Sequence, residues 1–200
     1  MAAVVLAAGS ASRMGRLKQL VPYGPRTLVQ HSVQQAIDAG FGPVIVVVGA
    51  EADAVRAAVA AQPVEIAENR QWQRGMGSSL AAGVQQLQAL PGHSAAVAIL
   101  LADQPLVASH HLKEMRRLLY TGTAPIVAAQ YNDTLGVPAV FKRELFVTLA
   151  SLPPDAGARH VLRDSGFAVT PYPLPEAAMD IDTPEDLAAL SASSAAADSI

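Results

Sequence analysis

Short apolar runs alternate with amphipathic, alanine-rich stretches along most of this chain of 200 residues. The run Val44–Val48 contains only β-branched residues, which is typical of a strand covered on both faces of a sheet. Residues 2–8 and Ala96–Leu101 are similar apolar runs, whereas residues 27–39 have the pattern of a helix with Thr27 as its N-cap. This alternation predicts an open α/β fold in which right-handed crossovers join parallel strands.

The same patterns place the remaining elements. We expect further helices over residues 53–61, 78–90, 109–120, 143–150, 158–165 and 184–190, and further strands over residues 64–67, 125–130, 138–141 and 167–171. The chain contains no internal repeat and no linker. We therefore expect one domain over residues 1–190, followed by a frayed tail over residues 191–200.

The composition limits the classes of partner. Apolar residues make up 51% of the chain and charged residues 16%, which is typical of a globular protein with a large core. The formal net charge is −3, and the sequence has no run of lysine or arginine. Nucleic acids and anionic membranes bind clustered positive charge, so we expect neither as a partner.

The absence of cysteine excludes disulfides, thiolate metal ligands and cysteine nucleophiles. No apolar segment reaches the ~20 residues that a membrane-spanning helix needs. The first apolar run has no basic region before it, which favours a buried strand over a signal peptide. We therefore expect a cytoplasmic protein.

The loop after the first expected strand, Gly9-Ser-Ala-Ser-Arg-Met-Gly-Arg-Leu-Lys18, has the composition of a phosphate-binding segment. Glycines let backbone N–H groups approach phosphates, and Ser10 and Ser12 add donors. Arg13 and Lys18 supply charges that suit a transferring phosphoryl group. The spacing matches neither a Walker A loop nor Gly-x-Gly-x-x-Gly. From residue types alone, an ordinary solvated loop stays equally open.

Asp103 directly follows the apolar run Ala96–Leu101. In an open α/β sheet, ligands bind outside the carboxyl ends of the strands, and Mg²⁺ prefers carboxylate oxygens there. Asp103 is also an acceptable cap for the helix expected near Ser109, but Ser109 itself is better placed for that task. We favour the magnesium site.

A second acidic cluster lies near the C-terminus. Asp180 and Asp182 alternate around Ile181, so one carboxylate can face a site while Ile181 faces the core. Residues 183–186 have the pattern of a helix start, which accounts for the two acidic residues at its end, Glu185 and Asp186. Asp180 and Asp182 remain as candidate ligands.

Taken as a whole string, residues 6–18 resemble the signature of the molybdopterin-type, MobA-like nucleotidyltransferases, L-A-[AG]-G-x-S-x-R-M-G-x-x-K. These enzymes belong to the larger group of nucleotide-diphospho-sugar transferases. The resemblance implies nucleotide contacts at Leu6, Ala7, Ala8, Gly9, Ser10, Ser12, Arg13 and Lys18, with Arg13, Lys18 and Asp103 as catalytic residues.

Two acidic motifs extend the resemblance. Residues 101–105 are similar to the family's L-x-D-Q-P, which implies that Asp103 binds the catalytic Mg²⁺ and that the neighbouring Gln104 contacts the acceptor. Residues 180–186 match D-[IV]-D-T-P-E-D, whose second aspartate implies Asp182, ahead of Asp180, as the other metal ligand.

A helix-opening motif extends it further. Residues 75–80 resemble G-M-x-x-S-[LI], which lies beside the base and the acceptor in the family and implies Gly75 and Ser79 as nucleotide contacts. A capped helix with a glycine-rich entry explains the same residues equally well.

The remaining motifs depart from the family pattern. Residues 136–138 resemble G-H-P with Val137 in place of histidine, and residues 154–159 resemble G-D-x-G-A-R with a proline at the first glycine. They imply acceptor contacts at Gly136, Pro138, Asp155 and Arg159. A plain strand entry at Gly136 and an N-cap at Asp155 are the structural alternatives.

The resemblance implies a single-domain, doubly wound and mostly parallel sheet with helices on both faces. It also implies attack by an acceptor phosphate oxygen on the α-phosphorus of an NTP, with release of pyrophosphate. Mg²⁺ on Asp103 and Asp182 would hold the α-phosphate, while Arg13 and Lys18 would stabilise the triphosphate.

The substrates are inferred from one pair of residues. Ala8-Gly9, where the guanylyl branch has two glycines, indicates CTP as donor and the molybdopterin cofactor as acceptor. Guanylyl transfer, or transfer to a sugar phosphate or phosphocholine, stays open. So does a non-catalytic accessory protein that hands molybdenum cofactor to an apo-enzyme. A transient contact with a molybdoenzyme or its chaperone is a further expectation.

Overall fold

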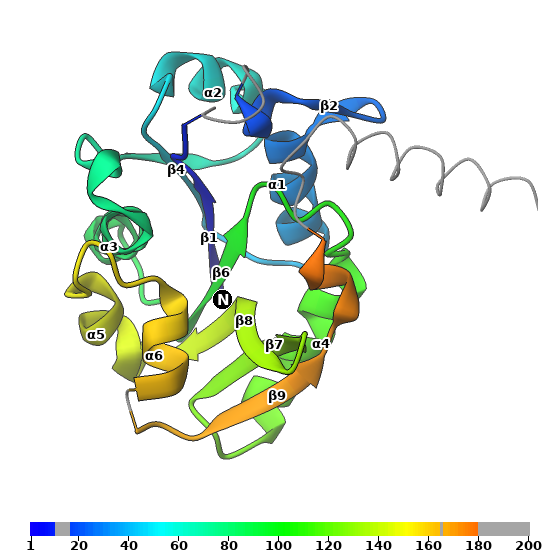
Figure 1. Ribbon diagram of the computed structural model, residues 1–200, viewed down its shortest axis with the longest axis vertical. Helices are drawn as coiled ribbons and strands as arrows, with labels where there is room; N and C mark the ends of the chain where they lie inside the picture. Colours follow the sequence, from blue (N-terminus) through cyan, green and yellow to red (C-terminus); the bar gives the residue numbers. More distant parts are fainter. Residues whose placement is uncertain (11–16, 165, 180–200) are drawn as a thin grey trace, which may run out of the picture.

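The computed structural model describes residues 1–10, 17–164 and 166–179. Within them, seven strands form one sheet in the order β5-β4-β1-β6-β8-β7-β9 (Figure 1). The strands are β1 (Ala2–Ala7), β4 (Val44–Val48), β5 (Glu65–Glu68), β6 (Ala96–Leu101), β7 (Ile126–Tyr131), β8 (Thr134–Lys142) and β9 (Val169–Pro173). Two short strands, β2 (Pro22–Tyr23) and β3 (Arg26–Thr27), pair with each other outside this sheet.

The α-helices are α1 (Leu28–Asp38), α2 (Ala52–Val59), α3 (Met76–Ala89), α4 (Ser109–Thr121), α5 (Phe146–Ala150) and α6 (Ala158–Asp164). Four 3₁₀ turns join them in the described residues: η1 (Lys18–Leu20), η2 (Trp72–Arg74), η3 (Arg143–Leu145) and η4 (Pro175–Ala178). No helix in the described parts of the chain has the length and apolar character that crossing a bilayer requires.

The core lies on both faces of the sheet, as the continuous apolar runs predict. Val5 of β1 packs in a cluster with residues of α1, α2 and α4, whereas Val4 packs in a second cluster with residues of α3, α5 and α6. Successive side chains of a strand point to opposite faces, so a strand covered on both sides must be apolar throughout. The doubly wound arrangement is confirmed.

Most element boundaries agree with the sequence-based expectations to within two residues. Thr27 is the N-cap of α1, and its backbone N–H donates to Gln30 Oε1 at 2.7 Å in a capping box. The expected cap of α4 is wrong: Ala108 occupies the N-cap position, and the Ser109 N–H donates to Gln35 Oε1 at 2.7 Å. The helix expected over residues 184–190 and the boundary at 190 lie outside the described residues.

One strand departs from the expected parallel connections. β8 is antiparallel to both β6 and β7, and it is longer than the strand expected over residues 138–141. Asn132 and Asp133, with φ of 49° and 55°, form a two-residue turn that joins β7 directly to β8. Such hairpin turns need positive φ at both positions, which asparagine and aspartate tolerate. The sheet is therefore mostly, not wholly, parallel.

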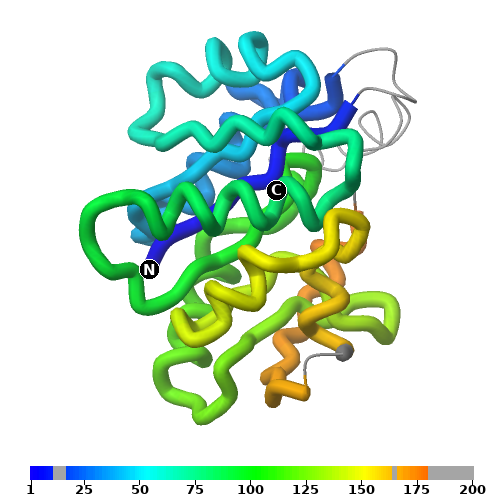
Figure 2. Tube along the Cα trace, turned by 90° about the vertical axis from the view of Figure 1, so that its left-hand side faces the viewer, coloured from blue at the N-terminus to red at the C-terminus, as the bar shows by residue number. Residues whose placement is uncertain are grey.

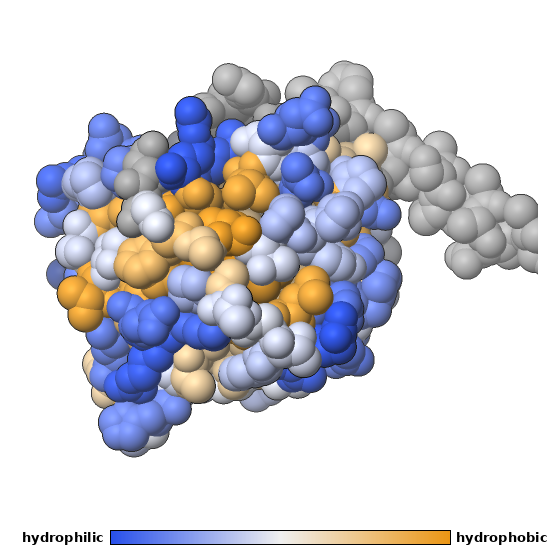
Figure 3. Space-filling view, turned by 90° about the horizontal axis from the view of Figure 1, so that it is seen from below, coloured by the Kyte–Doolittle hydropathy of each residue, from blue (hydrophilic) through white to orange (hydrophobic). Residues whose placement is uncertain are grey.

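Apolar side chains are also found on the surface. Val147 in α5 and Phe167 before β9 are exposed, and Figure 3 shows an apolar area among polar residues on the face seen from below. More than half of the surface of ordinary folded proteins comes from apolar atoms, so an apolar area of this kind is ordinary and does not by itself indicate a binding partner.

Gly83 sets how closely α3 lies over the sheet, and Figure 2 shows this helix crossing over β1. A Cβ atom at Gly83 would overlap Val4 Cγ1 and would lie 2.8 Å from Val47 Cγ2. Valine methyl groups in a packed core have little room to move. Only glycine therefore permits this approach.

We predict that Gly83→Ala lowers the free energy of unfolding, measured in urea, by about 1–2 kcal/mol. Two valine methyl groups would be overlapped, which places the overpacking cost at about 2–3 kcal/mol, and the gain in helix propensity offsets only about 1 kcal/mol of it. Gln88→Ala, at an exposed position of the same helix, is the control and should stay within about 0.5 kcal/mol of wild type. An unchanged or raised stability of Gly83→Ala would contradict the close packing.

Candidate active site

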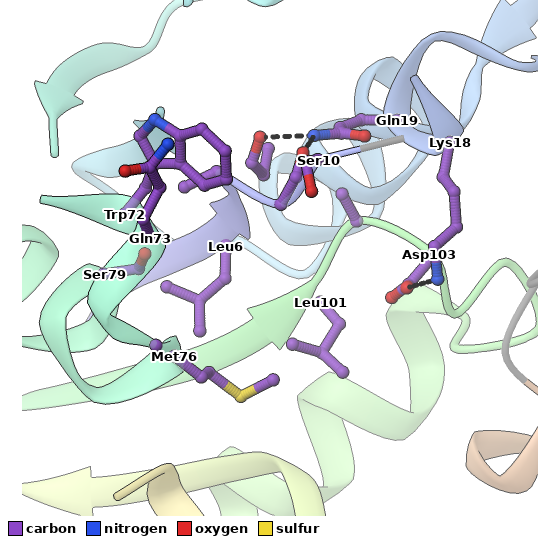
Figure 4. Close-up of a pocket in the computed structure, with 15 residues that line it drawn as sticks. Leu6, Ser10, Lys18, Gln19, Trp72, Gln73, Met76, Ser79, Leu101 and Asp103 are labelled. Carbon is purple, nitrogen blue, oxygen red and sulfur yellow. Dashed lines mark hydrogen bonds and ion pairs between the residues drawn. The ribbon is translucent and has the colours of Figure 1, made fainter. Parts of the chain in front are cut away.

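A cavity of about 470 Å³ opens at the carboxyl ends of β1 and β6 (Figure 4). Its volume lies in the range of small-molecule sites. Its walls come from the end of β1 and the following loop, from η1, from η2 and the start of α3, and from the end of β6. The lining residues are Leu6, Ala7, Ala8, Gly9, Ser10, Lys18, Gln19, Trp72, Gln73, Gly75, Met76, Ser79, Leu101, Ala102 and Asp103.

A lysine and an aspartate meet on this wall. Lys18 Nζ lies 3.2 Å from Asp103 Oδ2, and the two side chains are 27% and 25% exposed. They are 85 residues apart, but Leu6 of β1 pairs with Leu101 of β6, which brings the two following segments together. The cavity thus carries an ammonium and a carboxylate within reach of the same ligand.

Gln19, which the sequence reasoning missed, anchors the predicted phosphate loop. It is only 5% exposed, and its Nε2 donates to the carbonyl oxygens of Ala7 at 2.8 Å and Gly9 at 2.6 Å. Both N–H groups of the amide hold the backbone on either side of Ala8. Nothing in the residue pattern marks this glutamine, because the contact exists only once the chain returns to β1.

Helix α1 fixes the loop that carries Asp103. Ser32 Oγ donates to the Leu101 carbonyl at 3.1 Å, and His31 Nε2 donates to the Pro105 carbonyl at 3.0 Å. Burial lowers the pKa of His31, and the Pro105 carbonyl acts in the opposite direction. These bonds hold the backbone on both sides of Asp103.

Gln104 lies behind the cavity wall. It is 3% exposed, and its Nε2 donates to the carbonyl oxygens of Val137 at 3.3 Å and Ala177 at 2.7 Å. It therefore ties the Asp103 loop to β8 and to η4. The predicted acceptor contact at Gln104 stays a prediction.

The glycine-rich start of α3 packs against the segment over residues 153–156. The Ser78 N–H donates to the Pro154 carbonyl at 3.2 Å, and a Cβ atom at Gly75 (φ +121°) would lie 2.6 Å from that oxygen. Asn69, also missed by the sequence reasoning, is buried, and its Nδ2 donates to Ser79 Oγ at 3.0 Å. Gly75 and Ser79 both line the cavity, as a nucleotide contact requires.

The other predicted acceptor residues lie off the described cavity wall. Gly136 and Pro138 are buried in β8, where a Cβ atom at Gly136 would lie 2.8 Å from Tyr131 Cζ. Asp155 is exposed beside the start of α3, and Arg159 is exposed in α6, which begins three residues after Asp155. Packing against Tyr131 thus explains by itself why glycine occupies position 136, and the acceptor roles of all four residues stay predictions.

Ser12, Arg13, Asp180 and Asp182 lie outside the described residues. Among the residues that the structure does describe, no three of His, Cys, Asp and Glu form a group that could hold a metal. Asp103 is the acidic residue among those that line the cavity. A single carboxylate with room for phosphate and water is a fitting partial site for Mg²⁺, which binds through one or two carboxylates.

The signature loop is close to the family pattern but departs from it once. The pattern has a serine at residue 11, where this chain carries Ala11 between Ser10 and Ser12. The other defined positions, including Leu6, Gly9 and Lys18, agree with the pattern.

Solved structures resemble this fold closely. Rv0371c from Mycobacterium tuberculosis superposes with a TM-score of 0.79 at 30% identity, covering 94% of this chain and 96% of that one. A complex of Rv0371c with manganese gives a TM-score of 0.74 at 31% identity over the same shares. Molybdopterin-guanine dinucleotide biosynthesis protein A from Archaeoglobus fulgidus gives 0.72 at 15% identity over 98% and 99%, which shows the shared fold alone.

Curated relatives carry different names. Nicotine blue oxidoreductase from Paenarthrobacter nicotinovorans is 34% identical over 176 residues, which is 83% of each protein. The bifunctional protein GlmU of Anaeromyxobacter dehalogenans is 37% identical over 119 residues, 56% of this chain but only 24% of that protein.

The MobA-like NTP transferase domain matches residues 3–169, which include β1 from Ala3 onward, the loop to Lys18, and Asp103. The match thus leaves out Ala2 of β1 and all of β9 after Val169, but it spans every other described strand and the whole described cavity. The chain belongs to the family of MobA-like NTP transferase domains, a family of nucleotidyltransferases.

Proposed function

We propose that this protein transfers CMP from CTP to the phosphate of the molybdopterin cofactor and releases pyrophosphate. The observation that carries the proposal is the Lys18–Asp103 pair, 3.2 Å apart in a cavity of about 470 Å³ at the carboxyl end of β1. A cation for phosphates and a carboxylate for a divalent metal are the two charges that nucleotidyl transfer needs.

The reaction makes modest demands on the protein. An acceptor phosphate oxygen forms a bond to the α-phosphorus, and the bond from that phosphorus to the bridging oxygen of the β-phosphate breaks. The electron pair leaves with pyrophosphate, and no covalent enzyme intermediate forms. Catalysis then consists of alignment and of stabilising the developing negative charge, for which Lys18 lies on the cavity wall and Arg13 is the second proposed cation.

Asp103 and Asp182 are the residues that would hold the proposed Mg²⁺. When bound, this ion supplies Lewis-acid stabilisation of the α-phosphate charge. The manganese complex of the related Rv0371c supports a divalent metal at sites of this kind. The Lys18 ammonium neutralises the Asp103 carboxylate in the free protein and is positioned to move onto phosphate oxygens.

The choice of CTP and molybdopterin rests on the Ala8-Gly9 pair and on the family signature. Gln104, Gly136, Pro138, Asp155 and Arg159 are the acceptor residues under the same proposal. With a sugar phosphate as acceptor, the protein would catalyse the same nucleotidyl transfer. An accessory protein would bind the cofactor and catalyse no transfer. The name of the Paenarthrobacter relative adds a redox alternative, which the lack of a Gly-x-Gly-x-x-Gly loop disfavours.

The test is release of pyrophosphate from CTP, GTP, ATP or UTP, each with Mg²⁺ and with or without purified molybdopterin cofactor. We expect release with CTP and cofactor together. Release of pyrophosphate with a sugar phosphate in place of the cofactor would identify the sugar phosphate as the acceptor. Cofactor binding without release would favour the accessory protein, and oxidation of a reduced nicotinamide or flavin with an organic acceptor would favour the redox alternative.

We predict that Asp103→Asn lowers the rate of pyrophosphate release by about 100-fold or more, because metal stabilisation of transition-state charge is worth several kcal/mol. The matched control is Asp53→Asn, whose carboxylate is exposed in α2 and pairs with Arg56 one turn along the same helix. It should keep wild-type activity within about twofold. Activity of Asp103→Asn within a few-fold of wild type would contradict the metal role.

We predict that Lys18→Met has effects of opposite sign on two measurements. Turnover should fall, because a cation facing the triphosphate is lost. Binding of Mn²⁺ to the free protein, followed by electron paramagnetic resonance, should tighten by up to about fivefold, since a partly exposed ion pair is worth at most about 1 kcal/mol. Lys113→Met, at an exposed position of α4, is the control. Weaker Mn²⁺ binding by Lys18→Met would contradict competition for Asp103.

A further inference from the structure

The cavity has an aromatic end opposite its charged end. In Figure 4, Trp72, Gln73 and Ser79 lie on one side, and Lys18 and Asp103 lie on the other. Leu6 and Leu101 lie between these two groups. The charged end suits phosphates, so the aromatic end is available to a different part of the same ligand.

Gly49 lets Trp72 and Ala8, the residue that follows β1, both lie close to the backbone at the end of β4. This glycine follows β4, and a Cβ atom on it would lie 2.7 Å from Trp72 Cβ and 2.8 Å from Ala8 Cβ. Atoms do not approach so closely without displacement, so any larger residue at Gly49 would push Trp72 and Ala8 apart. Trp72 and Ala8 are therefore both close neighbours of Gly49, and both line the cavity.

Hydrogen bonds fix the short turn that carries Trp72. Asn69 Oδ1 accepts from the Gln71 N–H at 2.9 Å, while Asn69 Nδ2 holds Ser79 Oγ at 3.0 Å. The Gly75 N–H donates to the Trp72 carbonyl at 3.2 Å. The indole is thus held in place before any ligand enters, which reduces the ordering cost of binding.

Trp72 is only partly buried. One part of the side chain packs with the core cluster of β1 and α3, and the remainder faces the cavity. An indole held open towards water leaves apolar surface uncovered, and a flat aromatic ligand would cover it. A nucleobase is such a group, and every base has a face that stacks on an aromatic side chain.

We propose that Trp72 is the aromatic wall on which the nucleobase of the NTP packs, so that its triphosphate extends towards Lys18 and Asp103. This inference rests on the proposed function, because it assigns one part of the nucleotide to one end of the cavity. Trp72 then contributes affinity for the base, next to Ala8, the residue implicated in the choice of CTP, on the same cavity wall.

The chain has a single tryptophan, so its fluorescence reports on this wall alone. We expect CTP to quench the emission of the full-length protein in the presence of Mg²⁺. Inorganic tripolyphosphate, which has charges but no base, should bind in a calorimetric titration without comparable quenching. Quenching by purified molybdopterin cofactor but not by any NTP would assign the wall to the acceptor and would overturn the inference.

Two variants separate stacking from packing. Trp72→Phe keeps an aromatic face and should retain CTP affinity within a few-fold, whereas Trp72→Leu keeps apolar bulk and should lose about tenfold or more. Tripolyphosphate should bind both variants as it binds wild type. Thermal melting checks that both variants are folded. If Trp72→Leu does not fold, Trp72→Phe still tests the inference, because a large loss of CTP affinity in that variant would contradict stacking on an aromatic face.

The outcomes distinguish the two levels of the proposal. If no NTP binds the wild-type protein, the proposed function fails. If CTP binds wild type and Trp72→Leu equally well, the proposed function stands and the role of Trp72 is wrong. Equal loss of CTP and tripolyphosphate by Trp72→Leu would likewise overturn the inference, since it would indicate a general distortion of the cavity.

Discussion

The parallel pairing of β1 with β6 is the interaction on which the rest of the structure depends. Their registered residues run in parallel as far as Leu6 with Leu101, so the two strands end at the same edge of the sheet. The two segments that follow must therefore leave the sheet side by side. Lys18 and Asp103 meet because of this register, and a slip of one residue would turn every side chain of one strand to the other face.

Neutral amides, rather than charges, hold the walls of the cavity. Gln19, Asn69 and Gln104 are buried, and each bonds to two groups from other segments. An amide can satisfy buried carbonyl oxygens without bringing a second charge near the site. The charged groups Lys18 and Asp103 are thereby left at the cavity surface, where a ligand can reach them.

Sequence patterns predicted the fold well where burial was two-sided. Val44–Val48 and Ala96–Leu101 are strands with the predicted bounds, because a continuous apolar run has no other stable place than the centre of such a sheet. The hairpin from β7 to β8 was missed, since Asn132 and Asp133 give only a weak turn signal. The capping position of α4 was also wrong, because Gln35 of another helix satisfies the Ser109 N–H.

The sequence by itself determined the order along the chain of the strands of the main sheet and of the helices between them, the family, and the residues of the phosphate loop and Asp103 that line the cavity. Those follow from local periodicity and from short contiguous motifs. Only the tertiary structure decided that Gln19 anchors the loop, that Gly49 makes room for both Trp72 and Ala8, and that Gln104 is tied behind the wall. These contacts join segments far apart in the chain, and their geometry depends on how the sheet brings the segments together.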